Sequence, residues 1–525
     1  MSSNSNCDKI NSPGRRRIKP APLPRLKRAA GAAMNDVPLF SLDQVQLVYR
    51  ARPALDQLDW QVLPGQQWAC IGPNGSGKTS LARVLSGEAP HFAGSYQRDP
   101  ALAKQGVAYV CFEQARALCD RDRKLDDSET RADASDPGTT VASAILGARE
   151  PEQRFRDWVE RLGIGHILQR GLRYISTGEM RKTLFIRALL SDPGLLILDS
   201  PLDGVDRATR EELMAVIDEL MQSGLPLLLL CRDLDDLPTG CSHLLVLDEG
   251  RALCSGRREE VLADSRVEAL MRPPLPPLAP PPEPAERPYT LPADTPLLEL
   301  HGVNVSYGDT RVLRDVHWRF ERGQHCAIAG PNGCGKSTLL SLVTGDNHKA
   351  YGQDITLFGR RRGSGESIWD IKQKYGQVDT QLHLNFARGM RVLEVVVSGF
   401  FDSIGLYDDW GDRQRERALQ WLDALGLGGL AKDGFDTLSF GLQRMVLLAR
   451  AMVKSPAILL LDEPTLGLDG GHRRLVLRAI DHIASHCDTQ VIFVSHSVGD
   501  MPACINQRLV FEPRADGFEV VTYSD

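Results

Sequence analysis

Two eight-residue stretches of this chain share a pattern that binds phosphate. Residues 72–79 read Gly-Pro-Asn-Gly-Ser-Gly-Lys-Thr, and residues 330–337 read Gly-Pro-Asn-Gly-Cys-Gly-Lys-Ser. In such a P-loop, glycines let backbone N–H groups turn onto phosphate oxygens, the lysine reaches the terminal phosphates, and the last hydroxyl ligates Mg²⁺. The predicted nucleotide-binding residues are Gly72, Pro73, Asn74, Gly75, Ser76, Gly77, Lys78 and Thr79, and Gly330, Pro331, Asn332, Gly333, Cys334, Gly335, Lys336, Ser337 and Thr338. The sequence thus predicts two nucleotide sites.

Both loops stand in the local context that the chemistry requires. Apolar stretches at 67–71 and 325–329 predict a strand before each loop, and the patterns at 80–85 and 338–343 predict a helix after it. The positive N-terminal end of such a helix faces the bound anion. A glycine-rich turn without chemical consequence is the alternative, and the paired occurrence of strand, loop and helix disfavours it.

The chain is predicted to be a tandem duplication. Asp199 and Asp462 each end an apolar run, at 195–198 and 458–461, and their separation nearly equals that of Lys78 and Lys336. The predicted units are a basic disordered tail (1–36), a first domain (37–265), a proline-rich linker (266–296) and a second domain (297–525). A proline-rich ligand of the SH3 type is the alternative interpretation of the linker.

Charge and cysteine usage favour a cytoplasmic protein. The net charge of −6 conceals a tail, residues 1–34, with eight Lys or Arg and one Asp, which leaves −13 on the remainder. No apolar region follows this tail, so it does not predict a secretory signal; contact with anionic lipid or nucleic acid, or translation from Met34, are the other interpretations. The eleven cysteines show no metal-binding spacing. No apolar run is long enough to cross a membrane.

Further motifs resemble the ATP-binding cassette (ABC) superfamily. Residues 175–181 read Ile-Ser-Thr-Gly-Glu-Met-Arg and residues 438–444 read Leu-Ser-Phe-Gly-Leu-Gln-Arg, both similar to the Leu-Ser-Gly-Gly-Gln signature of that superfamily. Residues 462–469, Asp-Glu-Pro-Thr-Leu-Gly-Leu-Asp, are similar to its Walker B motif and D-loop. The order of P-loop, signature, Walker B motif and histidine identifies the chain as a member.

The resemblance implies a fold and a role for each matched residue. It implies two tandem α/β P-loop NTPase domains, each with a RecA-like core and a helical subdomain, that bind and hydrolyse ATP with Mg²⁺. Glu463 and His496 take the catalytic positions, and Tyr307, with Tyr49 as a weaker counterpart, the position that stacks on adenine. The metal ligands are Thr79, Asp199, Ser337 and Asp462, and the signature residues that contact the γ-phosphate are Ser176, Gly178, Ser439 and Gly441.

Two segments resemble one double-cassette branch of the superfamily, which is assigned to molybdate transport and is also associated with photorepair. They are residues 359–371 and 398–407. This resemblance implies an ATPase at the cytoplasmic face of the inner membrane, peripheral to a separate membrane-spanning permease. No residue of the chain reads out molybdate, so the cargo rests on the resemblance alone.

The two halves differ at the positions of the catalytic groups. Ser200 follows Asp199 where the second half has Glu463, and Arg232 stands where the second half has His496. A serine cannot accept a proton from water at neutral pH as a carboxylate can. With head-to-tail pairing of the two cassettes, the competent site combines the second P-loop with Ser176 and Gly178 of the first half. The impaired site combines the first P-loop with Ser439 and Gly441, and is expected to bind MgATP without efficient hydrolysis.

A loop that couples transporters to their membrane subunits is unusual here. The family's glutamine position falls on Phe112 and Thr380, while Gln114 and Gln381 lie one or two residues later. The rival interpretation is a soluble ABC ATPase acting in DNA repair or on ribosomes. The proline-rich linker cannot form the long helical pair of the ribosome-acting group, and a body at −13 disfavours direct nucleic-acid binding.

Overall fold

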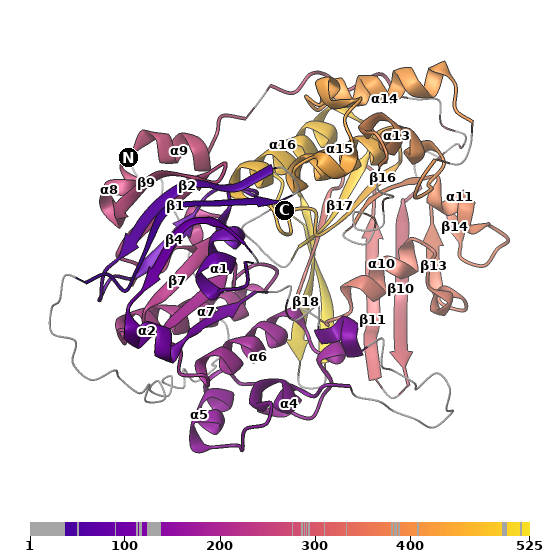
Figure 1. The fold of residues 1–525 in the computed structure, drawn as a ribbon. Coiled ribbons are helices and arrows are strands. Elements are labelled where there is room, and N and C mark those ends of the chain that lie inside the picture. Colours follow the sequence, from indigo (N-terminus) through magenta and orange to yellow (C-terminus); the bar gives the residue numbers. More distant parts are fainter. Residues whose placement is uncertain are drawn as a thin grey trace, which may run out of the picture.

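The computed structural model describes two α/β cassettes. The described residues are 37–49, 52–89, 91–111, 114, 118–122, 138–275, 277–284, 287, 289, 291, 295–308, 310–331, 333–379, 382, 386, 389–406, 409–495, 501–514 and 517–524. Figure 1 shows the first cassette in indigo to magenta and the second in salmon, orange and yellow. The predicted tail 1–36, Asn332 and His496 lie outside these residues, as do Phe112, Thr380 and Gln381.

The first cassette is built on a six-stranded sheet in the order β5-β6-β7-β3-β8-β9. Its strands are β5 (Val107–Val110), β6 (Leu195–Asp199), β7 (Leu227–Cys231), β3 (Trp68–Ile71), β8 (His243–Asp248) and β9 (Arg251–Arg257). The first five strands pair in parallel and β9 is antiparallel. Strands β6 and β7 are almost wholly apolar because helices or a second sheet cover both faces of a parallel sheet.

The second cassette repeats this topology as β15-β16-β17-β12-β18-β19. The strands are β15 (Tyr375–Val378), β16 (Ile458–Asp462), β17 (Gln490–Ser495), β12 (Cys326–Ala329), β18 (Gln507–Arg514) and β19 (Gly517–Ser524). The same strand order in both halves confirms the predicted duplication and the α/β class.

An antiparallel sheet lies beside each parallel sheet. The first consists of β2 (Arg52–Val62), β1 (Phe40–Tyr49) and β4 (Ala93–Arg98), and the second of β11 (Thr310–Phe320), β10 (Leu298–Tyr307), β13 (Asp354–Leu357) and β14 (Arg360–Arg361). Their inward side chains form one core with the P-loop helix and one face of the parallel sheet. This arrangement holds the P-loop between two sheets.

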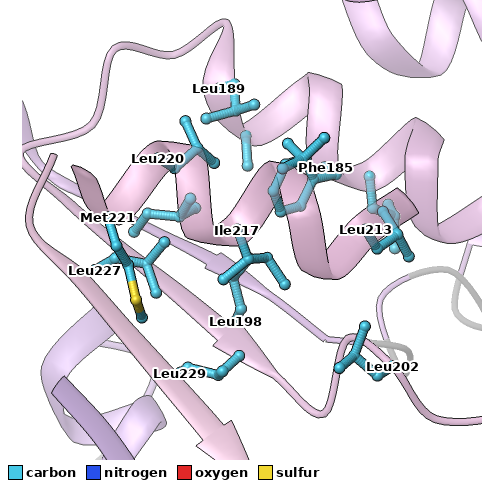
Figure 2. Close-up of a cluster of buried hydrophobic side chains, with 14 of the residues drawn as sticks. Phe185, Leu189, Leu198, Leu202, Leu213, Ile217, Leu220, Met221, Leu227 and Leu229 are labelled. Atoms are coloured by element: carbon cyan, nitrogen blue, oxygen red, sulfur yellow. The ribbon is translucent and has the colours of Figure 1, made fainter. Parts of the chain in front are cut away.

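Helices pack on both faces of each parallel sheet: the first two helices of each cassette lie on the side of the antiparallel sheet, and the remaining helices cover the opposite face. The helices of the first cassette are α1 (Lys78–Ser86), α2 (Pro100–Gln105), α4 (Val141–Leu146), α5 (Gln153–Arg161), α6 (Thr177–Leu189), α7 (Arg207–Gln222), α8 (Arg258–Leu262) and α9 (Ser265–Met271). Those of the second are α10 (Lys336–Val343), α11 (Ile368–Lys372), α13 (Val392–Val397), α14 (Asp412–Ala424), α15 (Phe440–Met452) and α16 (Gly470–His486). Figure 2 shows Phe185 of α6 and Ile217 of α7 above Leu198 and Leu229 of the sheet.

The proline-rich segment lies along the second cassette. Helix α9 occupies the start of the range assigned to the linker, and Met271 packs into the first core. Beyond it, helix α16 presents donors one turn apart: Arg474 to the carbonyl of Pro273 (3.2 Å), Arg478 to that of Leu275 (3.3 Å) and His482 to that of Ala279 (2.9 Å). Side chains four residues apart share one helix face, so α16 holds these three linker carbonyls in a row.

Within the described part of the chain, no helix is both long and apolar enough to traverse a bilayer. Nor do the described residues include a cluster of three or more His, Cys, Asp or Glu side chains arranged to hold a metal ion.

Candidate active site

The first P-loop forms a tight turn between β3 and α1. Lys78 Nζ donates to the carbonyls of Gly72 (2.7 Å) and Pro73 (2.8 Å), so the amine lies inside the loop. Gly77 has φ +104°, and a Cβ there would lie 2.5 Å from the carbonyl oxygen of Ala54. Burial lowers the pKa of Lys78. Only glycine fits this turn, and the loop that results is a cradle for phosphate with a lysine at its centre.

The second P-loop repeats the cradle between β12 and α10. Lys336 Nζ donates to the carbonyls of Gly330 and Pro331, both at 2.8 Å. Burial lowers the pKa of Lys336, and the nearby charges of Asp462 and Glu463 oppose this shift. Burial also raises the pKa of the Cys334 thiol, which is 1% exposed and fills the centre of the loop as a neutral group. Both loops therefore fit the phosphates of a nucleoside triphosphate.

The residues predicted to ligate Mg²⁺ meet at the first site. Thr79 Oγ1 donates to Asp199 Oδ2 at 2.8 Å, and the Tyr109 hydroxyl donates to the same oxygen at 3.1 Å. At the second site, Ser337 lies in the first turn of α10 and Asp462 ends β16. A hydroxyl beside a carboxylate is a hard-oxygen pair of the kind that Mg²⁺ prefers, so the donor set fits this ion.

Ser200 and Glu463 occupy the same backbone position in the two halves. Both have positive φ, +48° and +50°, and each N–H donates at 3.0 Å to the neighbouring strand, at Leu230 and Val494 respectively. The halves thus present a hydroxyl and a carboxylate from one geometry. That Glu463 is a general base, and that the first site lacks one, stay predictions of the sequence.

Arg232 occupies the histidine position of the first half. Its guanidinium contacts Asp203 Oδ2 at 2.7 Å and donates to the carbonyl of Gly467 in the other cassette at 3.0 Å. Ser200, Asp203, Arg232 and Glu463 line one cavity of about 360 Å³ that both cassettes enclose. The cation therefore joins the two cassettes beside the first nucleotide site.

Each signature serine begins a helix. Ser176 caps α6, and Glu179 completes a capping box through its bond to the Ser176 N–H at 2.7 Å. Ser439 caps α15 by accepting from the Leu442 N–H at 3.4 Å. Gly178 and Gly441 lie in the first turns of these helices. Both motifs present a hydroxyl at a helix N-terminus, where the macrodipole favours an anion.

Tyr307 ends β10 with a half-exposed ring. Its hydroxyl accepts from Asn347 Nδ2 at 2.9 Å, and Lys349 Nζ lies 5.2 Å from the ring centroid. These contacts fix the ring at the edge of the cassette with one surface in solvent. Tyr49 ends β1 in the equivalent place and is also partly exposed.

Polar contacts join the first P-loop to the second cassette. The Asn74 N–H donates to Asp469 Oδ2 at 3.2 Å, and its side-chain amide donates to the carbonyl of Gly467 at 3.2 Å. Arg473 forms an ion pair with Asp233 across the same boundary. The sequence assigned Asp469 to the D-loop, but it did not predict the contact of Asp469 with Asn74 or the pair of Arg473 with Asp233. The D-loop assignment of Asp469 was the one sequence signal that pointed to this boundary.

Comparison with known proteins identifies the family. The model of the ABC transporter family matches residues 55–203 and 313–466, one region in each cassette. The chain belongs to the ABC transporter ATP-binding family. It is 42% identical over 461 residues to the ABC transporter ATP-binding protein ModF of Escherichia coli (strain K12), covering 86% of this chain and 92% of that protein. The chain is thus an ABC-type ATPase.

More distant relatives share the double-cassette layout. An uncharacterized ABC transporter ATP-binding protein of Schizosaccharomyces pombe is 26% identical over 473 residues, covering 87% of this chain and 94% of that protein. Among solved structures, an archaeal ribosome recycling factor in complex with a ribosomal stalk protein aligns with a TM-score of 0.57 at 19% identity, covering 92% of this chain and 90% of that chain. At that identity, the similarity of the two structures supports only the fold of this ABC protein.

Proposed function

We propose that this ABC protein closes its two cassettes head to tail on two ATP molecules, hydrolysing one and holding the other. The observation that carries the proposal is the pair Ser200 and Glu463, which present different groups from the same backbone geometry. Mg²⁺ would bind at Thr79 with Asp199 and at Ser337 with Asp462, where it neutralises phosphate charge. In the competent site Glu463 accepts the proton of the attacking water, and His496 is proposed as the second catalytic residue.

Each nucleotide would lie between one P-loop and the opposite signature. The contact of Asn74 with Asp469 supports this pairing, because it brings the first P-loop against the helix that follows the second D-loop. Ser439 and Gly441 would then complete the holding site, and Ser176 and Gly178 the hydrolysing site. Tyr307 would stack on adenine in the hydrolysing site.

Mutation of the two P-loop lysines tests the asymmetry. Lys336→Ala is expected to abolish steady-state ATP hydrolysis, because it removes the cation from the only site with a carboxylate base. Lys78→Ala is expected to lower the rate only partly, through weaker closure. Site-resolved photolabelling with trapped ADP is the measurement. Equal yields of trapped ADP at both P-loops contradict the model.

The energy of closure would drive a separate membrane-spanning permease, with this protein peripheral at the cytoplasmic face of the inner membrane. Similarity to ModF supports this role, and molybdate, which the resemblance of the sequence implies, is the proposed cargo. Direct binding to nucleic acid is not part of the proposal, because the body of the chain is acidic.

Fractionation of native cells tests the transport role. We expect part of the protein to sediment with inner membranes and to be released by alkaline carbonate, since surface contacts alone would hold it there. Removal of residues 1–33 should leave this association intact. Sedimentation with ribosomes or nucleoid at modest salt, without membrane association, would replace the transport proposal by a soluble role in translation or DNA repair.

A further inference from the structure

His472, in the first turn of α16, is bonded on both sides of its ring. Nδ1 lies 2.9 Å from Asp469 Oδ2, and Nε2 lies 3.3 Å from Ser439 Oγ. The ring also packs on Gly441, where an added Cβ would lie 2.1 Å from it. A titratable side chain is therefore fixed against the signature serine of the second cassette.

The same chain of contacts reaches the first cassette. Asp469, which binds His472, also accepts the N–H of Asn74 in the first P-loop at 3.2 Å. The signature hydroxyl, the imidazole, the carboxylate and the P-loop backbone thus form one connected row. The imidazole lies in the middle of this row.

The first half carries a threonine at the equivalent position. Thr209 Oγ1 donates to Asp206 Oδ2 at 2.9 Å, and its methyl group lies 3.1 Å from where a Cβ of Gly178 would be. Threonine does not titrate in the physiological range. The two signatures therefore differ in having or lacking an ionisable neighbour.

The protonation state of the His472 ring determines whether the Ser439 hydroxyl can donate a hydrogen bond to another group. Burial would raise the pKa of Asp469, but hydrogen bonds from His472 hold it at about 2, so the carboxylate stays charged and accepts from Nδ1–H. In the neutral ring Nε2 carries no hydrogen and must accept a hydrogen bond from the Ser439 hydroxyl. In the imidazolium, Nε2–H donates to Ser439 Oγ, and the hydroxyl proton is free for another acceptor.

Charges of both signs lie near the ring. Asp469 and Arg232 line the same cavity as His472, about 140 Å³ in volume, so one anion and one cation face the ring. The neighbouring Arg473 is engaged by Asp233. A triphosphate placed beside Ser439 adds negative charge, which favours the imidazolium.

We propose that ATP binding at the holding site takes up a proton on His472, which converts Ser439 into a hydrogen-bond donor to the terminal phosphate. His472 is thus a positioning residue that makes affinity for ATP at this site depend on pH. The inference rests on the proposed function, since it takes Ser439 to face the nucleotide of the first P-loop. The hydrolysing site, with Thr209 at the equivalent position, lacks this dependence.

Proton uptake measured by calorimetry tests the inference. Full-length Lys336→Ala protein confines MgATP to the first P-loop, and titration at pH 7.5 in two buffers of different ionisation enthalpy reports the protons bound. We expect a net uptake of protons, at most about one per ATP, and an affinity for MgATP that falls as pH rises, by up to about tenfold per pH unit. Zero uptake overturns the inference.

Two substitutions test whether the measured proton uptake occurs on the His472 ring. In the same background, His472→Gln keeps a donor toward Ser439 but cannot titrate, so binding should persist with no uptake and a flat pH profile. His472→Thr copies the first half, should also take up no proton, and serves if the glutamine variant does not fold. Thr209→Ala is the matched control and should retain uptake. Uptake that persists in either His472 variant overturns the inference.

One further variant separates this inference from the proposed function. MgATP that still binds when Lys78 and Lys336 are both alanine would overturn the assignment of the P-loops as the nucleotide sites. Binding that requires Lys78, but releases or takes up the same protons with and without His472, would overturn the inference alone.

Discussion

At the scale of single residues, the two sites differ by a few side chains on a shared backbone. The left-handed conformation at Ser200 and Glu463 is the same, so the difference between them is chemical. Arg232 adds a second difference, because it binds the opposite D-loop at Gly467. An arginine has no lone pair to offer and cannot take over a histidine's acid–base role. The residue that stands at the histidine position of the first half thus also makes a contact between the cassettes.

Glu463→Gln is expected to lower steady-state ATP turnover by about 10²–10⁴-fold, because the amide cannot accept the proton of the attacking water. ATP binding should persist, and the protein should accumulate in the closed state. Phosphate release and equilibrium ATP binding are the measurements. Ser200→Ala is the matched control and should leave turnover within about threefold. Turnover of the Glu463 variant within a few-fold of the parent refutes the assignment of the base.

At the scale of elements, a buried ion pair organises the segment between β14 and α11. Arg362 and Glu366 meet at 2.7 Å, with side chains only 3% and 6% exposed. Burial would raise the pKa of Glu366, but hydrogen bonds from Gly363 and other backbone N–H groups and from Arg362 hold it at about 2. This segment carries part of the resemblance noted in the sequence. Its conformation depends on one carboxylate.

Glu366→Gln is expected to lower the free energy of unfolding of the second cassette by about 2–3 kcal/mol at pH 7, because Arg362 stays buried without its counter-ion. A carboxyl group whose pKa is lower in the folded state than in the unfolded state stabilises the fold at pH values above its unfolded-state pKa. This stabilisation is lost as pH falls toward the folded-state pKa. The difference between variant and parent should therefore shrink below about pH 4.5. Urea unfolding at pH 7 and pH 3.5 measures it.

The control is Glu321→Gln, which removes a pair with Arg319 whose side chains are 48% and 58% exposed. An exposed pair contributes about 0–1 kcal/mol, so this change should be small and nearly independent of pH. A Glu366 variant that matches this control would refute the stabilising role of the buried pair.

At the scale of the whole molecule, helix α16 contacts both the other cassette and the linker. Arg473 pairs with Asp233 of the first cassette, whereas the adjacent Arg474 donates to the linker carbonyl of Pro273. Successive helix positions point about 100° apart, so neighbouring arginines serve different surfaces. The helix thereby holds the first cassette with one arginine and the linker with the next.

Arg473→Ala is expected to raise the KM for ATP roughly tenfold, because closure loses a charged hydrogen bond and leaves Asp233 without this partner. Arg474→Ala is the matched control, since it removes the same charge from the same helix but takes away a hydrogen bond to the linker. Its KM should stay within about twofold of the parent. Equal effects of the two variants would contradict a specific role for the contact between cassettes.

The sequence by itself determined the two P-loops, the strands and helices around them, and the missing carboxylate at Ser200. These features are local: the loop geometry depends on glycines and a lysine within eight residues, and the apolar runs at β6 and β16 need only burial. The sequence also predicted the order of domains, because the motifs recur at a nearly constant separation.

Only the tertiary structure decided which residues meet across the cassettes. Asn74 and Asp469 are 395 positions apart, and Arg232 and Gly467 are 235 apart, so no local pattern pairs them. No sequence motif marks His472, and only the structure shows its contact with Ser439, 33 positions away. Such contacts arise from the packing of whole sheets and helices, whose relative placement depends on the sum of many apolar contacts that no short motif encodes.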